Sequence, residues 1–283
     1  MSAPYLTILV LSVLVLFFGM CRLLIGLNCR EKRCEFGCCK TIGSREVQED
    51  FYRVIITNDG MLAVLADGMG KELGGKIAAR RVTEVLAELF KEYNALDHPI
   101  YFFQKAFQSA NREVLKLFDD GRGSAVASAI MLRKGDFVGD LPTLYYAIVG
   151  NVKIAVFRNG ELIPVGTGHT VNVLAENKYY CGDLTREDAL AMLNETRVYH
   201  YIGRDDFKDI EFYDTPIQLK KNDIVVLMSD GVYEELHWRE LEEYLGQRKT
   251  CRQIALDVIE HINRKQGTKD NACIVLVRVG ELL

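Results

Sequence analysis

The amino-acid sequence predicts an α+β domain in which mainly antiparallel sheets are covered by helices. Three observations lead to this prediction: two β-hairpins closed by Asn-Asp-Gly and Asn-Gly turns, two long amphipathic helical patterns between strand-like runs, and a last helix followed by an apolar strand. The 283 residues are 49% hydrophobic and 26% charged, which is ordinary for a globular protein with a sizeable core.

Turn residues locate the strands. In FYRVIITNDGMLAVLAD, the residues Asn58, Asp59 and Gly60 separate two apolar runs, which is the pattern of a tight hairpin. The segment VKIAVFRNGELIPV repeats this pattern around Asn159 and Gly160. Further strands are predicted for ASAIMLRKGD, for TLYYAIVG and, near the end of the chain, for NACIVLVRV. Strands joined by such short turns form antiparallel sheets.

Helices are predicted where apolar residues recur at spacings of three and four. Two such patterns run from Ile77 to Phe90 and from Phe103 to Phe118, and a third helix is expected from about residue 238 to residue 264. Each pattern has one apolar face to bury against a sheet. Because no linker or repeat interrupts this region, we expect residues 41–283 to form one domain. We also expect this domain to be monomeric.

The N-terminal segment differs from the rest of the chain. YLTILVLSVLVLFFGMCRLLIGL, residues 5–27, carries no charge before Arg22 and is long enough to cross a hydrocarbon core of about 30 Å as a helix. The start MSAPYL has no basic residue and no Ala-x-Ala site follows the apolar run, which disfavours a cleaved signal peptide. We therefore predict a transmembrane anchor at residues 1–28 and a basic, cysteine-containing juxtamembrane linker at residues 29–40.

Charges and cysteines indicate the compartment. The basic residues that follow the apolar segment, Arg30, Lys32, Arg33 and Lys40, place the domain in the cytoplasm of a single-pass protein of the cell membrane. The five cysteines of this region lack the paired Cys-x-x-Cys spacing of a zinc site, so we interpret them as reduced thiols. A formal net charge of −4 provides no basic field for nucleic acid, which we exclude as a partner.

Five carboxylates stand where predicted strands begin or end. They are Asp67 after MLAVLA, Asp230 after DIVVLMS, Asp270 before ACIVLVRV, and the pair Glu49 and Asp50 before FYRVII. Any one of them alone is more often a turn former or a helix cap. Strands that end side by side bring such residues to one point, and oxygen ligands are what a hard divalent cation prefers. The joint pattern therefore predicts a metal site.

Two further residues fit this predicted site. Gly68 follows Asp67 and lacks a Cβ, so we expect the backbone to turn there and its carbonyl oxygen to face the cation as well. Arg45 precedes Glu49 by four residues and belongs near the same site if that segment is extended. Its guanidinium group suits bidentate phosphate binding, but pairing with Glu46 or Glu49 at the surface is an equal alternative.

Six motifs, in order, resemble those of the metal-dependent protein serine/threonine phosphatases (protein phosphatase type 2C), most of all the bacterial members. They are GSREVQEDFY, LAVLADGMGKELGGKIAA, GSAVASAIML, VGNVKIAVFRNGEL, VVLMSDGVYEEL and TKDNACIVLVRV. The match runs from about residue 41 to residue 279. The resemblance implies a four-layer αββα sandwich of two antiparallel sheets flanked by helices, with a site for two Mg²⁺ or Mn²⁺ ions at one end.

The resemblance also implies a reaction and a role for each candidate residue. The reaction is hydrolysis of phosphoserine or phosphothreonine on cytoplasmic proteins by a hydroxide that two divalent ions activate, without a covalent phosphoenzyme. The implied roles are as follows: Asp67 bridges both ions, the Gly68 carbonyl completes one ion, Asp230 and Asp270 hold the other, Glu49 and Asp50 act mostly through metal-bound waters, and Arg45 binds the phosphate.

The sequence departs from the family pattern at several positions. Met69 stands where eukaryotic members have histidine, so we expect a metal-bound water to protonate the leaving group. Asn151 replaces the aspartate of Gly-Asp-Ser-Arg, which puts a third metal ion in doubt because an amide is a poorer ligand than a carboxylate. We interpret His169 as a loop histidine that bonds to the backbone rather than as a catalytic group.

Two other functions are weighed against the phosphatase. A catalytically weak or inactive relative would keep the fold and only bind phosphoproteins, but the retained carboxylates and Arg45 favour an active enzyme. A nucleotide-binding loop at DGMGKELGG is disfavoured, because Glu72 rather than serine or threonine follows Lys71.

Overall fold

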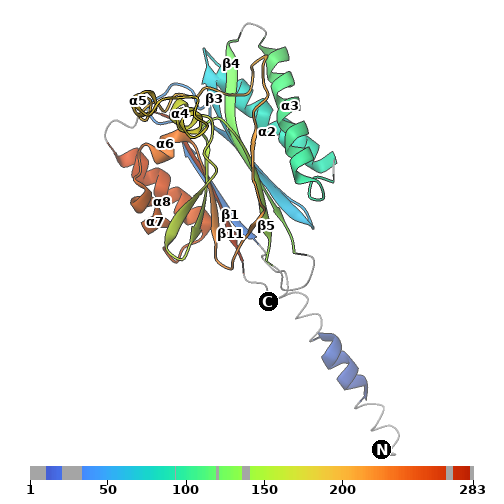
Figure 1. Cartoon of the computed structure of the whole chain (residues 1–283). Coiled ribbons are helices and arrows are strands. Elements are labelled where there is room, and N and C mark those ends of the chain that lie inside the picture. Colours follow the sequence, from blue (N-terminus) through green and yellow to red (C-terminus); the bar gives the residue numbers. More distant parts are fainter. Residues whose placement is uncertain are drawn as a thin grey trace, which may run out of the picture.

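Two stacked β-sheets carry helices on their outer faces (Figure 1). The computed structural model describes residues 11–20, 34–92, 94–118, 121–135, 141–265 and 270–280. Within these ranges, runs of consecutive strands alternate with runs of two or three helices.

The first sheet, sheet A, has the strand order β1-β11-β10-β6-β7, with every neighbouring pair antiparallel. Its strands are β1 (Cys34–Thr41), β6 (Lys153–Arg158), β7 (Glu161–Val165), β10 (Ile224–Met228) and β11 (Ala272–Val279). The hairpin of β6 and β7 confirms the prediction, and both turn residues, Asn159 and Gly160, have the positive φ that such a turn requires.

The second sheet, sheet B, has the order β2-β3-β4-β5-β8, and β9 also pairs with β5. Its strands are β2 (Phe51–Ile56), β3 (Gly60–Gly70), β4 (Gly123–Arg133), β5 (Thr143–Val149), β8 (Glu211–Phe212) and β9 (Ile217–Gln218). The predicted hairpin of β2 and β3 is confirmed, because Phe51 pairs with Ala66 and Ile56 pairs with Met61.

Helices complete four layers. The helices α2 (Gly74–Glu92) and α3 (Pro99–Leu117) cover sheet B, whereas α7 (Trp238–Leu245) and α8 (Cys251–Arg264) cover sheet A. Side chains alternate along β3: Leu62 and Val64 pack against helices, and Ala63 and Leu65 pack between the sheets. The shorter helices α4 (Val171–Tyr180), α5 (Arg186–Ala191) and α6 (Asp230–Tyr233) lie in the connections.

The long helix predicted from Trp238 to Arg264 is in fact two helices. α7 ends at Leu245, and α8 starts again after Thr250, whose side chain accepts a hydrogen bond from the Gln253 N–H. The Gln253 side chain accepts from the Thr250 N–H in return, and such a capping box begins a new helix.

The predicted juxtamembrane linker overlaps a strand. Residues 34–40 belong to β1, which pairs with β11 over its whole length, from Cys34 opposite Val279 to Thr41 opposite Ala272. The sandwich therefore begins seven residues earlier than the expected residue 41. The rest of that linker, residues 29–33, lies outside the described residues.

Only part of the predicted anchor falls within the described residues. Residues 11–20 are helical, and the remainder of residues 1–28 lies outside the described residues. In the described ranges, no helix combines the length and the apolar character needed to cross a membrane.

The strand directions give the sandwich two different ends. β3 and β10 run toward the end that carries Asp67 and Asp230, and we call this the carboxylate end. The opposite end, which we call the far end, holds the first residue of β1, the first residue of β10 and the last residue of β11.

Candidate metal and phosphate site

Five carboxylates from both sheets meet at the carboxylate end. Asp67 lies in β3, Glu49 and Asp50 precede β2, Asp230 follows β10 as the first residue of α6, and Asp270 precedes β11. Burial, and then the charges of the other four groups, raise the pKa of Asp67 well above its ordinary value. The structure thus brings together every carboxylate that the sequence singled out.

Asp67 lies inside β3 rather than at its end, contrary to the prediction. The strand continues past it to Gly70, and Gly68 pairs with Ala125 of β4 instead of starting a turn. A Cβ at Gly68 would come within 2.2 Å of the Gly75 carbonyl oxygen at the start of α2. Glycine is therefore required here because the first turn of a helix packs directly on the strand backbone.

Asp50 is fully buried and only half satisfied. Its Oδ2 accepts a hydrogen bond of 2.9 Å from Ser229 Oγ, which in turn accepts from the Cys273 N–H. No described residue donates to its Oδ1. Burial first, and then the charges of Asp230 and Asp270, raise the pKa of Asp50 to about 7, against the lowering effect of the Ser229 bond. An unpartnered buried carboxylate oxygen is a place for a cation or for a water molecule that a cation holds.

Arg45 forms a bidentate ion pair with Asp270. Arg45 Nε donates to Oδ1 at 3.1 Å, and Nη2 donates to Oδ2 at 2.7 Å. Oδ1 also accepts from the Asn271 N–H at 2.8 Å. The alternative pairing of Arg45 with Glu46 or Glu49 is thus not what forms, and the guanidinium group lies at the metal-ligand candidates, where the phosphate interpretation needs it.

Asn271 holds the candidate site together and was not singled out by the sequence analysis. It is 4% exposed, its Oδ1 accepts from the Glu49 N–H at 2.7 Å, and its Nδ2 donates to the Ile42 carbonyl at 2.9 Å. The side chain thereby ties the segment that carries Arg45 and Glu49 to the start of β11. The Asp-Asn pair before a strand marks this position in the sequence, but a neutral amide does not stand out as a candidate metal ligand.

Asp230 is positioned by two neutral groups. Asn151 Nδ2 donates to Asp230 Oδ2 at 3.3 Å, and the Tyr233 hydroxyl donates to the Asn151 carbonyl at 3.1 Å. The Lys153 ammonium group lies 3.9 Å from the centre of the Tyr233 ring. Burial and the charge of Asp270 raise the pKa of Asp230, and the Asn151 bond opposes this rise. An aspartate at position 151 could not donate this bond.

Glu49 completes the acidic group from the side of α2. Burial raises its pKa, while a hydrogen bond from the Lys76 backbone lowers it. Glu49 Oε1 lies so close to Gly75 that a Cβ on this glycine would come within 2.4 Å of it. The glycines at the start of α2 therefore make room both for β3 and for Glu49.

This arrangement fits divalent cations. A self-repelling set of carboxylates with one orphaned oxygen gains free energy when positive charge enters, and Mg²⁺ typically takes one or two carboxylates and completes its shell with water. In the described part of the chain, no three acidic, histidine or cysteine side chains are already close enough to surround one ion by themselves.

His169 takes no part in this site, as predicted. It is 5% exposed, and its Nδ1 accepts a hydrogen bond of 3.1 Å from the Gly150 N–H. Burial, together with the nearby ring of His200, lowers the pKa of His169 to about 4. It is a neutral loop histidine that bonds to the backbone.

Comparison with known proteins assigns the chain to a family. The sequence profile of protein phosphatase 2C matches residues 40–255, which is most of the chain. The chain belongs to the protein phosphatase 2C family. The match runs from the last two residues of β1 to the start of α8 and therefore includes four of the five clustered carboxylates, with Asp270 beyond its end.

Relatives of this protein phosphatase 2C include bacterial serine/threonine phosphatases. Serine/threonine phosphatase stp of Listeria monocytogenes serotype 4b (strain F2365) is 24% identical over 224 residues, which cover 76% of this chain and 83% of the Listeria protein. The solved serine/threonine phosphatase of S. agalactiae is 24% identical and has a TM-score of 0.70, covering 87% of this chain and 99% of that chain.

A third relative was solved with metal. The catalytic domain of the serine/threonine protein phosphatase PstP, in complex with 2 manganese ions, is 22% identical with a TM-score of 0.63, covering 88% of this chain and 99% of that chain. These likenesses show that two antiparallel sheets with outer helices are the fold that this protein phosphatase 2C shares with them.

Proposed function

We propose that this protein phosphatase 2C hydrolyses phosphoserine and phosphothreonine on cytoplasmic proteins with the help of two Mg²⁺ or Mn²⁺ ions. The observation that carries the proposal is the convergence of four carboxylates on Asp67, whose pKa is raised by burial and then by their charges. Membership of the family and the two manganese ions of PstP support the same assignment.

Each acidic residue has a place in the proposed site. We assign them as follows: Asp67 would contact both ions, the Gly68 carbonyl would bind one, Asp230 and Asp270 would hold the other, and Glu49 and Asp50 would hold water molecules of the ions. When bound, the two ions supply a lowered pKa for a shared water molecule and positive charge beside the phosphoryl oxygens. No protein nucleophile is required.

The side chains around the acidic group fix its geometry. Ser229 donates to Asp50, Asn151 donates to Asp230, and Asn271 accepts from the backbone N–H of Glu49. These hydrogen bonds keep the carboxylates oriented when substrate binds. The planar guanidinium group of Arg45 lies beside these carboxylates and can donate to two phosphate oxygens at once. Such bidentate binding aligns the phosphorus atom for in-line attack.

Two substitutions shape the proposed chemistry. The Met69 thioether has no proton to give, so the leaving serine or threonine oxygen takes its proton from water in the site. Asn151 uses its amide N–H groups as donors toward Asp230, which favours two ions over three.

The experiment that tests this function is hydrolysis of p-nitrophenyl phosphate by the purified full chain. We expect activity with Mn²⁺, loss of activity with EDTA, and its return when Mn²⁺ is restored. Binding of a phosphothreonine peptide without any hydrolysis under these conditions would instead establish the alternative, a phosphoprotein-binding module.

We also propose that residues 1–28 anchor the phosphatase domain to the cell membrane with the domain in the cytoplasm. The support is the apolar sequence of residues 5–27 and the basic residues that follow it. Protease added to intact cells should leave the domain whole, whereas digestion of the domain from outside would reverse the proposed orientation.

A further inference from the structure

We propose that the far end of the sandwich is a membrane-facing surface that binds anionic phospholipid headgroups. The inference rests on the anchor proposed above, because the anchor is what brings this end of the domain to a bilayer. It goes further by giving the folded domain itself a lipid-binding role.

The topology places the far end next to the predicted anchor. β1 starts at Cys34, opposite Val279, the last residue of β11. Asn222, two residues before β10, donates its N–H to the Val279 carbonyl. Six residues, 28–33, separate Cys34 from the apolar segment and span at most about 20 Å. The carboxylate end lies roughly 26 Å farther away, the length of eight strand residues.

Basic residues from two connections and one strand gather at the far end. They are Lys220 and Lys221 before β10, Arg248 and Lys249 between α7 and α8, and Arg278 in β11. Lys249 pairs with Asp257 at 2.7 Å and Arg278 pairs with Glu35 at 3.2 Å, whereas neither Lys220 nor Arg248 forms an ion pair in the described part of the chain. The whole protein carries a net charge of −4, so this concentration of positive charge is local.

A groove of about 620 Å³ opens among these residues. Its lining includes Arg248, Lys249 and Arg278, together with the neutral donors Asn222, Thr250 and Gln253. Cationic side chains beside amide and hydroxyl groups are suited to a phosphodiester, which carries one negative charge and several acceptor oxygens. Basic pockets of this kind next to a membrane segment bind lipid headgroups.

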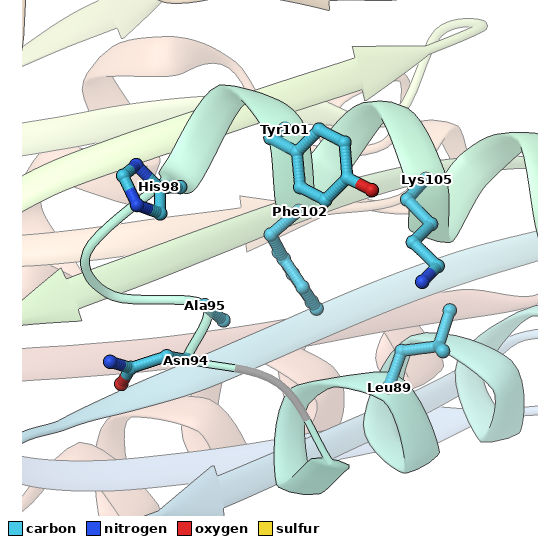
Figure 2. A pocket seen from close by; sticks show the side chains of 7 residues that line it. All are labelled: Leu89, Asn94, Ala95, His98, Tyr101, Phe102 and Lys105. Atoms are coloured by element: carbon cyan, nitrogen blue, oxygen red, sulfur yellow. The ribbon is translucent and has the colours of Figure 1, made fainter.

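Exposed apolar side chains at the same end favour a lipid bilayer, rather than a soluble anion, as the binding partner of this surface. Ile56, at the end of β2, is 59% exposed, and Ile100 and Tyr101, at the start of α3, are 46% and 62% exposed. Figure 2 shows Tyr101 and Lys105 on one side of α3, above Leu89 of α2. Tyrosine and lysine with an apolar body and a polar tip are typical of membrane interfaces.

Hydrogen–deuterium exchange of the full chain in lipid nanodiscs tests the proposal. In discs that contain phosphatidylglycerol, amides of residues 219–223 and 246–250 should exchange about tenfold more slowly than in discs of phosphatidylcholine alone. Amides of residues 176–187, from the last turn of α4 to the start of α5, serve as the internal control and should exchange equally in both kinds of disc.

Two double variants with the same change in net charge distinguish lipid binding by the far end from a general effect of the protein's charge. Lys220→Glu with Arg248→Glu should abolish the slowing, whereas Lys178→Glu with Arg186→Glu, on α4 and α5, should leave it intact.

Three outcomes would contradict the proposal. Equal exchange of the wild-type protein in both kinds of disc would show that the far end does not bind anionic lipid, while leaving the anchor in place. Slowing in phosphatidylcholine discs on addition of soluble glycerol phosphate would also overturn it, because the site would then recognise a free phosphate. A chain that does not enter nanodiscs at all would overturn the anchor and this inference together, without touching the proposed hydrolysis.

Discussion

Arg45 holds Asp270 by both of its carboxylate oxygens, at 3.1 and 2.7 Å. The first is the proposed phosphate ligand and the second a proposed metal ligand. Their side chains are 57% and 42% exposed, and an ion pair in such a setting contributes only about 0 to 1 kcal/mol. The pair can therefore open at little cost, and a cation and a guanidinium group compete for the same two oxygens. Metal binding and phosphate binding should be linked through this pair.

Replacement of Arg45 by alanine should separate the two binding events. We expect a lower Mn²⁺ concentration for half-maximal activity, because a competing positive charge is gone from Asp270. The KM for a phosphothreonine peptide should rise by about ten- to hundredfold, the loss expected for charge-assisted hydrogen bonds to phosphate. Steady-state kinetics over a range of Mn²⁺ concentrations measures both quantities.

The matched control is Arg53→Ala, because Arg53 is an exposed arginine that pairs with Glu84 away from the site. It should change neither quantity. An Arg45 variant with unchanged KM for the peptide would remove Arg45 from substrate binding.

Asp67→Asn should stabilise the metal-free protein while it abolishes hydrolysis. The substitution removes a charge that burial and four neighbouring carboxylates disfavour. In EDTA we expect a rise in Tm of roughly 3 °C, the shift that 1 kcal/mol produces in a domain of this size. The additional rise in Tm that Mn²⁺ gives the wild-type protein should be lost. Differential scanning calorimetry with and without Mn²⁺ measures both effects.

Asp223→Asn is the contrasting control. Asp223 is 2% exposed and accepts hydrogen bonds from Arg158 at 2.6 to 3.1 Å. Loss of its charge leaves that guanidinium group uncompensated, so the free energy of unfolding should fall by about 3 kcal/mol. If both substitutions lowered the Tm in EDTA alike, the carboxylates around Asp67 would not be repelling one another.

Asn151→Asp should make the fold depend more strongly on metal. The new carboxylate takes away the donor to Asp230 and adds a like charge beside it. We expect a lower Tm in EDTA than in the wild-type protein and a larger increase on addition of Mn²⁺. Asn151→Ala loses the donor without adding charge and should show the smaller deficit. Identical Mn²⁺ responses of the Asp variant and the wild-type protein would mean that position 151 does not influence metal binding.

His169 should make the protein sensitive to acid. Its pKa is about 4 in the folded protein and about 6.5 in the unfolded chain, so between these values only the unfolded chain binds the proton. The free energy of unfolding is therefore at its full value above pH 6.5 and falls as the pH drops toward 4, by up to ~1.4 kcal/mol per pH unit.

His169→Asn tests this source of acid sensitivity. The side-chain oxygen of the new asparagine can still accept a hydrogen bond from the Gly150 N–H, but the asparagine does not titrate. The free energy of unfolding, measured in urea, should therefore depend less on pH below 6.5. His169→Ala loses the acceptor as well and should be less stable at every pH. A wild-type slope in the Asn variant would place the acid sensitivity elsewhere.

Local signals account for the parts of the fold that the sequence predicted. The hairpins at Asn58–Gly60 and Asn159–Gly160 follow from turn chemistry, and α2 and α3 follow from their periodicity. β1 was missed because CEFGCCKT has no turn signal and becomes a strand only by pairing with β11, more than two hundred residues away. Long-range pairing of this kind leaves no trace in a short window, and a chain cut at residue 41 would lack an edge strand of the sandwich.

The candidate site, too, could be predicted only in part from the sequence. Its charged members were predicted because carboxylates at strand ends are visible in the sequence, and the structure brings them together. The extension of β3 beyond Asp67 was not predictable, since pairing with β4 decides it. Ser229, Asn271 and Tyr233 are neutral, and their importance lies in hydrogen bonds to residues far away in the chain.

The measurement that tests the central claim most directly is phosphate release from a phosphothreonine peptide by the wild-type protein and by Asp67→Asn, each titrated with Mn²⁺. The account predicts that the wild-type rate rises from zero with Mn²⁺ and returns to zero with EDTA, and that the variant, though folded by calorimetry, releases no phosphate at any Mn²⁺ concentration. Release by the variant at the wild-type rate, or by the wild-type protein in EDTA, would contradict the claim that the carboxylates around Asp67 hold the ions that hydrolyse phosphoproteins.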